Sequence, residues 1–175
     1  MMLNEFDLIQ HFFNQEPSNR KDIILGIGDD AALLQMPLGQ QLVVTTDTLV
    51  SGRHFSKNTS PTDIGYKALA VSLSDLAAMG AEPAWILLAL TLPNANEIWL
   101  RKFSDGFFPL IQRFQLQLVG GDMTQGPLTI TVQALGFVPP GKASCRIGAH
   151  AGDRIYVTGT LGDAGLALET INKGD

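Results

Sequence analysis

The sequence lacks the features that mark several classes of protein. It has one cysteine, Cys145, in 175 residues. An intrachain disulfide framework is therefore excluded, and a reducing compartment is expected. Lysine and arginine together number 12, against 17 aspartate and glutamate residues. This acidic balance gives no reason to expect binding to nucleic acid or to an anionic membrane surface.

Long apolar runs are also missing. The longest, AWILLALTL, is flanked by Pro83 and Pro93 and falls well short of the ~18 residues of a membrane-spanning helix. The first residues do not combine a basic stretch with an apolar one, so no signal peptide is expected. The sequence therefore predicts a cytoplasmic protein that does not enter a membrane.

Several common catalytic motifs are absent as well. No G-x-x-x-x-G-K-[ST] sequence occurs, which argues against a P-loop kinase. No G-x-S-x-G elbow occurs, and the spacing of His and Cys matches no zinc site. The segment GIGDDA superficially matches a dinucleotide fingerprint, but Pro37 and Gly39 interrupt the long helix that a Rossmann turn must open.

What the sequence does contain is a set of aspartates beside or within apolar runs: Asp29, Asp30, Asp47, Asp75 and Asp122. A carboxylate next to a core is costly unless a positive group pairs with it. Too few lysines and arginines have apolar neighbours to neutralise all of them. Carboxylate oxygens favour hard cations, so the pattern predicts a cluster of Mg²⁺ ions.

Each aspartate also has a simpler interpretation. Asp29 and Asp30 are common turn formers, and residues 45–48 could be a solvated strand end. Asp75 could form a surface ion pair, but no Lys or Arg lies three or four residues away. The glycines of residues 120–122 would let backbone N–H groups approach a phosphate. The glycines within residues 159–165 could form a second anion turn or simply allow a helix to begin.

The apolar periodicity predicts an α+β fold: a mostly antiparallel four-stranded sheet covered by two long helices. Residues 1–149 are predicted to form an N-terminal domain that holds the predicted metal ligands and a dimer surface. Residues 150–175 are predicted to open an incomplete C-terminal domain with its first βα unit. Strands are predicted at residues 23–27, 31–36, 42–49, 84–92, 117–120, 128–138 and 154–158, and helices at 4–13, 60–80, 96–114 and 163–171. Gly106 and Pro109 are expected to weaken the helix at 96–114.

Together, the segments GIGDDAAL, TTDTLVSGRHF, YKALAVSLSDLAAMGAEP, LVGGDMTQGPLTITV and GDRIYVTG resemble bacterial thiamine-monophosphate kinases. That family belongs to a wider group with aminoimidazole ribonucleotide synthetase and selenophosphate synthetase. The resemblance implies the N-terminal-domain fold of aminoimidazole ribonucleotide synthetase. It also implies phosphorylation of thiamine monophosphate by ATP and Mg²⁺, giving thiamine diphosphate.

The same resemblance implies roles for particular residues. His54 would contact the phosphate of thiamine monophosphate, and Gly121, Asp122 and Arg146 would contact ATP. The implied ligands of several Mg²⁺ ions are Asp30, Thr45, Thr46, Asp47, Asp75 and Asp122. A homodimer through the N-terminal sheet is also implied. Family members are nearly twice as long as this chain, so the chain alone is expected to be inactive.

No general base is assigned. The acceptor is a phosphate monoester, whose oxygen is already an anionic nucleophile, so direct in-line attack on the γ-phosphoryl group needs no base. Two other interpretations stay open. A selenophosphate synthetase would carry a reactive cysteine near its N-terminus, whereas the cysteine here is Cys145. A module that binds nucleotide or metal without turnover is the alternative from another class.

Overall fold

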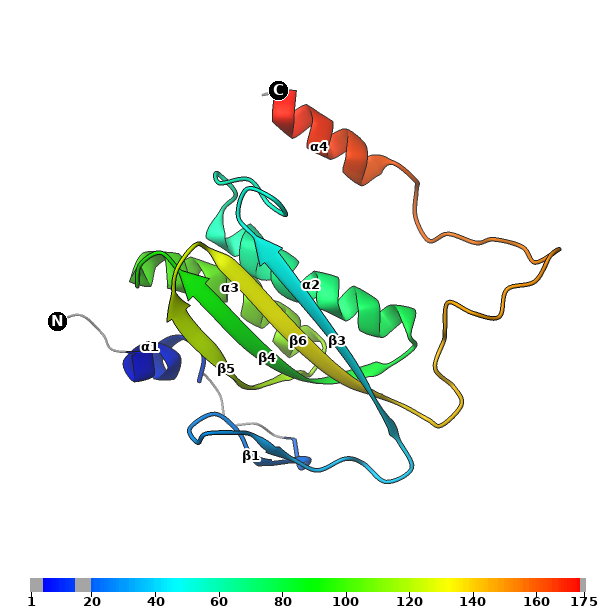
Figure 1. The fold of residues 1–175 in the computed structure, drawn as a ribbon, viewed down its shortest axis with the longest axis horizontal. Helices are drawn as coiled ribbons and strands as arrows, with labels where there is room; N and C mark the ends of the chain where they lie inside the picture. The colour runs from blue at the N-terminus through cyan, green and yellow to red at the C-terminus, as the bar shows by residue number, and fades with distance from the viewer. Residues whose placement is uncertain (1–4, 15–19, 174–175) are drawn as a thin grey trace. The chain divides into compact units, whose positions relative to one another are not determined.

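The computed structural model describes residues 5–14 and 20–173 of the chain. Figure 1 shows the fold. The chain divides into two compact units, the first ending at Ser144 and the second beginning at Cys145. This division comes somewhat before residue 150, where the sequence predicts a domain boundary.

The first unit is built on a four-stranded sheet in the order β3-β6-β4-β5. Strand β6 (Thr129–Val138) pairs antiparallel with both β3 (Gln41–Val50) and β4 (Glu82–Leu92), and β5 (Gln117–Gln125) pairs parallel with β4. A parallel pair needs a long crossover connection, and helix α3 (Glu97–Arg113) supplies it. The predicted α+β class is confirmed.

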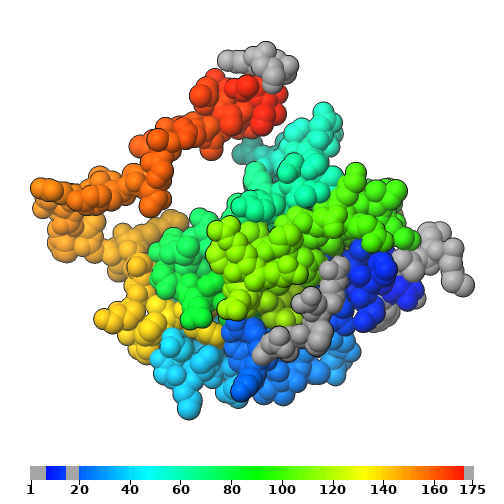
Figure 2. All heavy atoms as spheres, turned by 180° about the vertical axis from the view of Figure 1, so that it is seen from behind, coloured from blue at the N-terminus to red at the C-terminus, as the bar shows by residue number. Residues whose placement is uncertain are grey.

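Helices α2 (Pro61–Ala78) and α3 lie side by side on one face of this sheet (Figure 1). Alternate residues of the strands point toward them, among them Ile86 and Leu88 of β4 and Ile130 and Val132 of β6, all buried in the main core. Figure 2 shows the molecule from the side of the helices, where the atoms of α2 and α3 hide much of the sheet. The chain itself therefore covers one face of the sheet with its two long helices.

The two long helices meet backbone to backbone at a pair of glycines. A Cβ at Gly65 would lie 2.2 Å from the carbonyl oxygen of Phe103, and one at Gly106 would lie 1.9 Å from that of Thr62. The sequence predicts that Gly106 and Pro109 weaken this helix, but α3 continues through both residues. Gly106 is the place where α2 comes closest, so its missing side chain serves the packing of the two helices.

A small hairpin packs on the other face of the sheet, at one end. It consists of β1 (Ile23–Leu25) and β2 (Leu33–Leu34), which pair antiparallel. Trp85 alternates along β4 with residues that face the helices, so it points toward this second face. With Phe137 it forms a second apolar cluster, against which the hairpin segment packs Ile23, Ala32, Leu34 and Met36.

Strands β1 and β2 are shorter than the strands predicted at residues 23–27 and 31–36, and two further strands differ from the sequence-based prediction. Strand β5 extends to Gln125, so residues 120–122 lie inside a strand that pairs with β4 and do not form a turn. The strand predicted at residues 154–158 is not formed, and the regular element among the described residues of the second unit is helix α4 (Asp163–Lys173). A strand without a neighbour leaves its backbone N–H and C=O groups without ladder partners, which explains the difference.

The amphipathic helix predicted at residues 4–13 is present as α1 (Glu5–Phe12), while Asn4 lies outside the described residues. Its Leu8 and Phe12 are buried, and the guanidinium carbon of Arg101 in α3 lies 5.8 Å from the centre of the Phe12 ring. Among residues 5–14 and 20–173, neither this helix nor any other is long and apolar enough to span a membrane.

Candidate functional site

Strand β3 and helix α2 bring several of the predicted site residues together. Thr45 and Asp47 lie two apart on β3 and share the face toward α2. Ser72 and Asp75 lie three apart on α2 and share one side of the helix. Thr45 Oγ1 donates to Asp75 Oδ2 at 2.8 Å, and Ser72 Oγ donates to Asp47 Oδ2 at 2.9 Å. Each element thus supplies a carboxylate and the hydroxyl that orients the carboxylate of the other.

Ser72 was not identified from the sequence. Its side chain is fully buried, and its oxygen lies 2.9 Å from Asp47 Oδ2 and 3.5 Å from the carbonyl oxygen of Val132. A hydroxyl carries one hydrogen, so the shorter distance assigns it to Asp47. The available signal was a hydroxyl three residues before Asp75, on a helical face that is otherwise apolar.

Thr46 and Asp122 lie on the opposite face of the sheet. Thr46 alternates with residues that face α2, and Gln133 Nε2 donates to its hydroxyl at 3.4 Å. Asp122 is exposed and stands opposite Ala89 in the ladder. Met123 packs against the core beneath the helices, so Asp122 beside it points away from them.

The sheet therefore separates the predicted metal ligands into two groups. Asp47 is opposite Val132, Val132 is opposite Leu88, and Leu88 is opposite Gly121, the neighbour of Asp122. Three strand spacings of about 4.8 Å each separate the outer strands. Within the part of the chain that the structure describes, no group of three or more His, Cys, Asp or Glu residues is placed to hold a metal ion. The assignment of one shared cluster stays a prediction.

Asp30 lies on the turn that joins β1 to β2. Asp29 Oδ1 accepts a hydrogen bond of 2.8 Å from the N–H of Asp30, and both residues are exposed. Gly28 has a φ of 126°, a conformation that residues with a side chain rarely adopt. The backbone of this turn is therefore shaped by glycine, and its carboxylates face solvent.

His54 lies on the loop between β3 and α2. Its Nδ1 accepts a hydrogen bond of 3.0 Å from the N–H of Val50, so the ring proton is on Nε2. The ammonium group of Lys67 in α2 donates to the backbone carbonyl of His54. The ring is held from one side, and its Nε2–H is left to donate to a ligand.

Gly121 and Arg146 are the remaining predicted residues. A Cβ at Gly121 would lie 1.9 Å from the carbonyl oxygen of Leu88, so the contact between β4 and β5 itself requires glycine there. Arg146 is exposed and belongs to the second unit. Their contact with a nucleotide stays a prediction.

The chemistry of the donors between β3 and α2 suits one class of cation. Thr45, Asp47, Ser72 and Asp75 offer only hydroxyl and carboxylate oxygens. Such a donor set fits a hard divalent cation such as Mg²⁺, whereas zinc and copper sites usually include nitrogen or sulfur ligands. The residues present therefore fit the metal that the sequence predicts.

Comparison with known families tests the resemblance that the sequence motifs indicate. Residues 28–138 match the family described as AIR synthase related protein, N-terminal domain. This span contains the whole four-stranded sheet and both long helices. The chain belongs to that family. The relationship with the aminoimidazole ribonucleotide synthetase group that the sequence motifs indicate is confirmed.

Relatives within this family carry a more specific name. The thiamine-monophosphate kinase of Escherichia coli strain K12 is 56% identical over 170 residues, covering 96% of this chain and 52% of the relative. The crystal structure of thiamine-monophosphate kinase from Stenotrophomonas maltophilia K279a superposes with a TM-score of 0.84 at 57% identity, covering 89% of this chain and 49% of that one. The resemblance to thiamine-monophosphate kinases is confirmed.

A third similar structure is described as AaThiL complexed with AMPPCP and TMP. It has a TM-score of 0.70 and 33% identity, covering 100% of this chain and 56% of that one. The chain thus spans about half the length of the relatives and structures that it matches.

Proposed function

We propose that this chain is the metal- and nucleotide-binding part of a thiamine-phosphate kinase, which uses ATP to convert thiamine monophosphate to thiamine diphosphate. The observation that carries the proposal is the 56% identity with the Escherichia coli thiamine-monophosphate kinase across 96% of this chain. The oxygen-only donor set between β3 and α2 supports it, because phosphoryl transfer from ATP requires Mg²⁺.

In this proposal several Mg²⁺ ions would be held by Asp30, Thr45, Thr46, Asp47, Asp75 and Asp122. Bound Mg²⁺ would neutralise charge on the phosphate oxygens, which is the main electrostatic requirement of phosphoryl transfer. Thr45 and Ser72 fix the directions of the Asp75 and Asp47 carboxylates before any ligand arrives. Such preorganisation lowers the cost of assembling the site.

The remaining residues handle the two substrates. His54 donates from Nε2 to the phosphate of thiamine monophosphate, and Gly121, Asp122 and Arg146 contact ATP. The acceptor phosphate oxygen attacks the γ-phosphoryl group directly and in line, so no side chain has to remove a proton. The protein's task is positioning and charge compensation.

The proposal includes a cytoplasmic homodimer. Its two chains would join through the open face of the sheet, which is the face that α2 and α3 do not cover. Strand β3 lies at the edge of the sheet, and Leu42, Val44 and Val50 on this strand are 43%, 48% and 37% exposed. Exposed apolar side chains along an edge strand are typical of a surface that pairs with another chain.

A second candidate is a module that binds nucleotide and metal without turnover. The observation in its favour is that the chain matches only about half of the length of the relatives. Sites for phosphoryl transfer usually need walls around both phosphates to exclude water. We therefore expect Mg²⁺-dependent nucleotide binding by this chain, with little or no turnover by the chain alone.

Two measurements test the proposal. Calorimetric titration with AMPPCP should show binding that requires Mg²⁺, and Asp47→Asn or Asp75→Asn should weaken it at least about tenfold. Asp105→Asn is the matched control, since Asp105 is exposed on α3 and outside the site. Nucleotide affinity that does not change on adding Mg²⁺, or in either site variant, would contradict the metal assignment.

The second measurement is release of ADP with thiamine monophosphate as acceptor. The turnover of this chain is compared with that of the Escherichia coli relative, whose matching region covers 96% of this chain. Binding of Mg²⁺ and AMPPCP without ADP release fits the expected loss of turnover. A kcat equal to that of the relative would show that the other half of the relative is dispensable.

A further inference from the structure

We infer that three side chains, Arg20, Asp22 and Trp85, form a clamp that positions the turn at residues 28–30 for metal binding. The inference rests on the proposed function, because it assigns the clamp a role through Asp30. The clamp residues lie outside the predicted ligand set and would act through position alone. They are therefore positioning residues.

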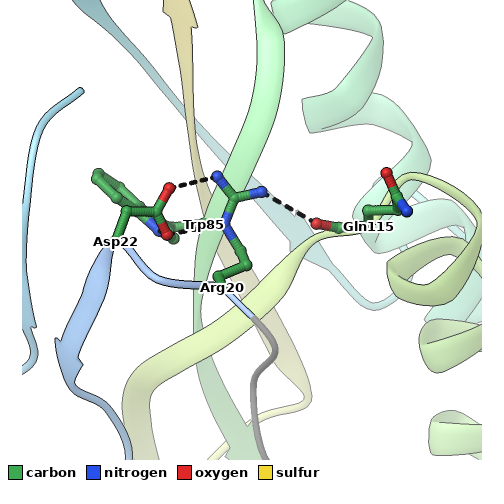
Figure 3. Close-up of polar contacts among 4 residues, drawn as sticks. All are labelled: Arg20, Asp22, Trp85 and Gln115. Atoms are coloured by element: carbon green, nitrogen blue, oxygen red, sulfur yellow. Dashed lines mark hydrogen bonds and ion pairs between the residues drawn. The ribbon is translucent and has the colours of Figure 1, made fainter. Parts of the chain in front are cut away.

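The geometry of the clamp centres on the Asp22 carboxylate (Figure 3). Oδ2 accepts from Nη2 of Arg20 at 2.6 Å, and Oδ1 accepts from Nε of Arg20 at 3.0 Å and from Nε1 of Trp85 at 3.2 Å. A bidentate pairing of guanidinium and carboxylate fixes both the distance and the orientation of the two groups, which a single hydrogen bond does not.

The clamp joins parts of the chain that are distant in sequence. Asp22 directly precedes β1, and Trp85 belongs to β4 in the main sheet. The Arg20 guanidinium also donates from Nη1 to the carbonyl oxygen of Gln115, at 3.2 Å, just before β5 (Figure 3). Gln115 has a φ of 52°, which residues other than glycine rarely adopt. The surrounding structure therefore determines this corner closely.

The hairpin that the clamp holds is too small to be stable by itself. Its paired strands, β1 and β2, have three and two residues, and isolated two-stranded hairpins are marginal at best in water. The backbone carbonyl of Asp22 accepts from the N–H of Gln35 at 2.8 Å and closes the base of the hairpin. One residue thus closes the hairpin with its backbone and ties it to the sheet with its side chain.

The tip of this hairpin carries Asp30, the predicted metal ligand that the clamp would position. Gly28, Asp29 and Asp30 lie on the connection between β1 and β2, and both carboxylates are exposed. The position of Asp30 relative to the sheet depends on where the base of the hairpin is fixed. The base is fixed by the clamp and by the apolar cluster around Trp85.

The charge state of the clamp suits this role. Partial burial raises the pKa of Asp22, but the hydrogen bonds from Arg20 and Trp85 and the charge of Arg20 outweigh it, and the pKa is lower than usual. Asp22 is therefore ionised at neutral pH and compensated by Arg20. The clamp adds no net charge near the turn, so its effect on a bound cation is one of geometry.

The test uses this chain, three clamp variants and one control variant. Asp22→Asn keeps the shape of the side chain and removes its charge, and Arg20→Lys keeps the charge and removes the bidentate pairing. Trp85→Phe keeps most of the apolar contact while losing the N–H. Asp105→Asn again controls for the loss of one negative charge. The readouts are the Mg²⁺ concentration that gives half-maximal AMPPCP binding and hydrogen exchange in residues 23–36.

The inference predicts faster exchange in residues 23–36 and a higher Mg²⁺ midpoint in the clamp variants. The rise should be about tenfold for Asp22→Asn, as for other residues that orient metal ligands, and smaller for Trp85→Phe. AMPPCP affinity at saturating Mg²⁺ should change little, which separates a shifted ligand from general destabilisation. Asp105→Asn should match the parent chain in every readout.

Two results would overturn the inference in different ways. Faster exchange with an unchanged Mg²⁺ midpoint would leave the clamp a purely structural feature, while the proposed function stands. Failure of the unsubstituted chain to bind AMPPCP in a Mg²⁺-dependent way would overturn the proposed function, and the clamp's role in metal binding with it.

Discussion

At the scale of single residues, the reciprocal hydrogen bonds between β3 and α2 are the most informative contacts. The hydroxyl of Thr45 on the strand donates to the carboxylate of Asp75 on the helix, and the hydroxyl of Ser72 on the helix donates to the carboxylate of Asp47 on the strand. A shift of the helix against the strand would break both bonds together. The arrangement therefore couples the directions of the two carboxylates to the packing of α2 on the sheet.

We expect Ser72→Ala to lower the free energy of unfolding by about 1–2 kcal/mol, because it removes a buried donor to a carboxylate. It should also weaken Mg²⁺-dependent AMPPCP binding, since Asp47 loses its orientation. Urea unfolding and calorimetry measure the two effects. Ser74→Ala is the control, because Ser74 is exposed on the same helix, and its change should stay below ~0.5 kcal/mol. Equal behaviour of the two variants would contradict the role of Ser72.

Asp22 predicts a specific dependence of stability on pH. Its pKa in the folded state is lowered from the ordinary value of 3.8, so the folded protein favours the ionised form more than the unfolded chain does. The clamp's contribution is then complete above pH 3.8 and is lost as the pH falls below that value, through the lowered pKa.

Asp22→Asn should therefore be less stable than the parent chain at pH 7. The difference should narrow as the pH falls below about 4, where the parent also loses the charge. Urea midpoints measured from about pH 7 to about pH 3 for both proteins test this. A difference that stays constant over the whole range would show that ionisation of Asp22 does not contribute.

At the scale of helices and strands, the sequence predicted the elements that have a local sequence signal. Alternation and apolar spacing located α2, α3 and β4, and hence the α+β class. They could not show that Gly121 sits inside β5, because its need for glycine comes from the carbonyl oxygen of Leu88 on a neighbouring strand. Asp22 and Trp85 are likewise 63 residues apart, and neither residue carries a motif. Contacts made only in the folded chain leave no local signal.

The glycine pair between α2 and α3 gives a prediction at this scale. Gly→Ala in a helix normally stabilises it by up to about 1 kcal/mol. At Gly65 and Gly106, however, the new Cβ would lie about 2 Å from a backbone oxygen of the other helix. Each substitution should therefore destabilise the first unit by roughly 1–3 kcal/mol, through forced separation of the helices.

The control is Gly165→Ala in α4, where a Cβ would have no atom within 4 Å. Differential scanning calorimetry should show a lower Tm for Gly65→Ala and Gly106→Ala but not for Gly165→Ala. If all three substitutions left the Tm unchanged or raised it, the close contact between α2 and α3 would not contribute to stability.

At the scale of the whole molecule, the two faces of the sheet differ. Among the described residues of the first unit, α2 and α3 cover one face, and the hairpin covers one end of the other. The open part carries Thr46 and Asp122 among the predicted ligands, together with the exposed apolar residues of β3. A partner chain on this face would cover apolar surface and lie beside those two ligands.

The proposed homodimer can be tested on that face. In light scattering at micromolar concentration, the chain should have twice the 18.8 kDa mass of one chain. Val44→Arg would place a charge on the open face and should shift the protein toward the monomer, because an unpaired buried charge is costly. Val44 is already 48% exposed within one chain, so the substitution should leave the fold intact, as circular dichroism can check.

Leu38→Arg is the matched control. Leu38 is 99% exposed on the turn before β3, so it gains the same charge away from the open face of the sheet. It should keep the dimer mass and the circular dichroism spectrum of the parent chain. A monomer mass for the parent chain would contradict the dimer outright. Dissociation by Leu38→Arg but not by Val44→Arg would instead place the contact between chains away from the sheet, and Thr46 and Asp122 would then face solvent.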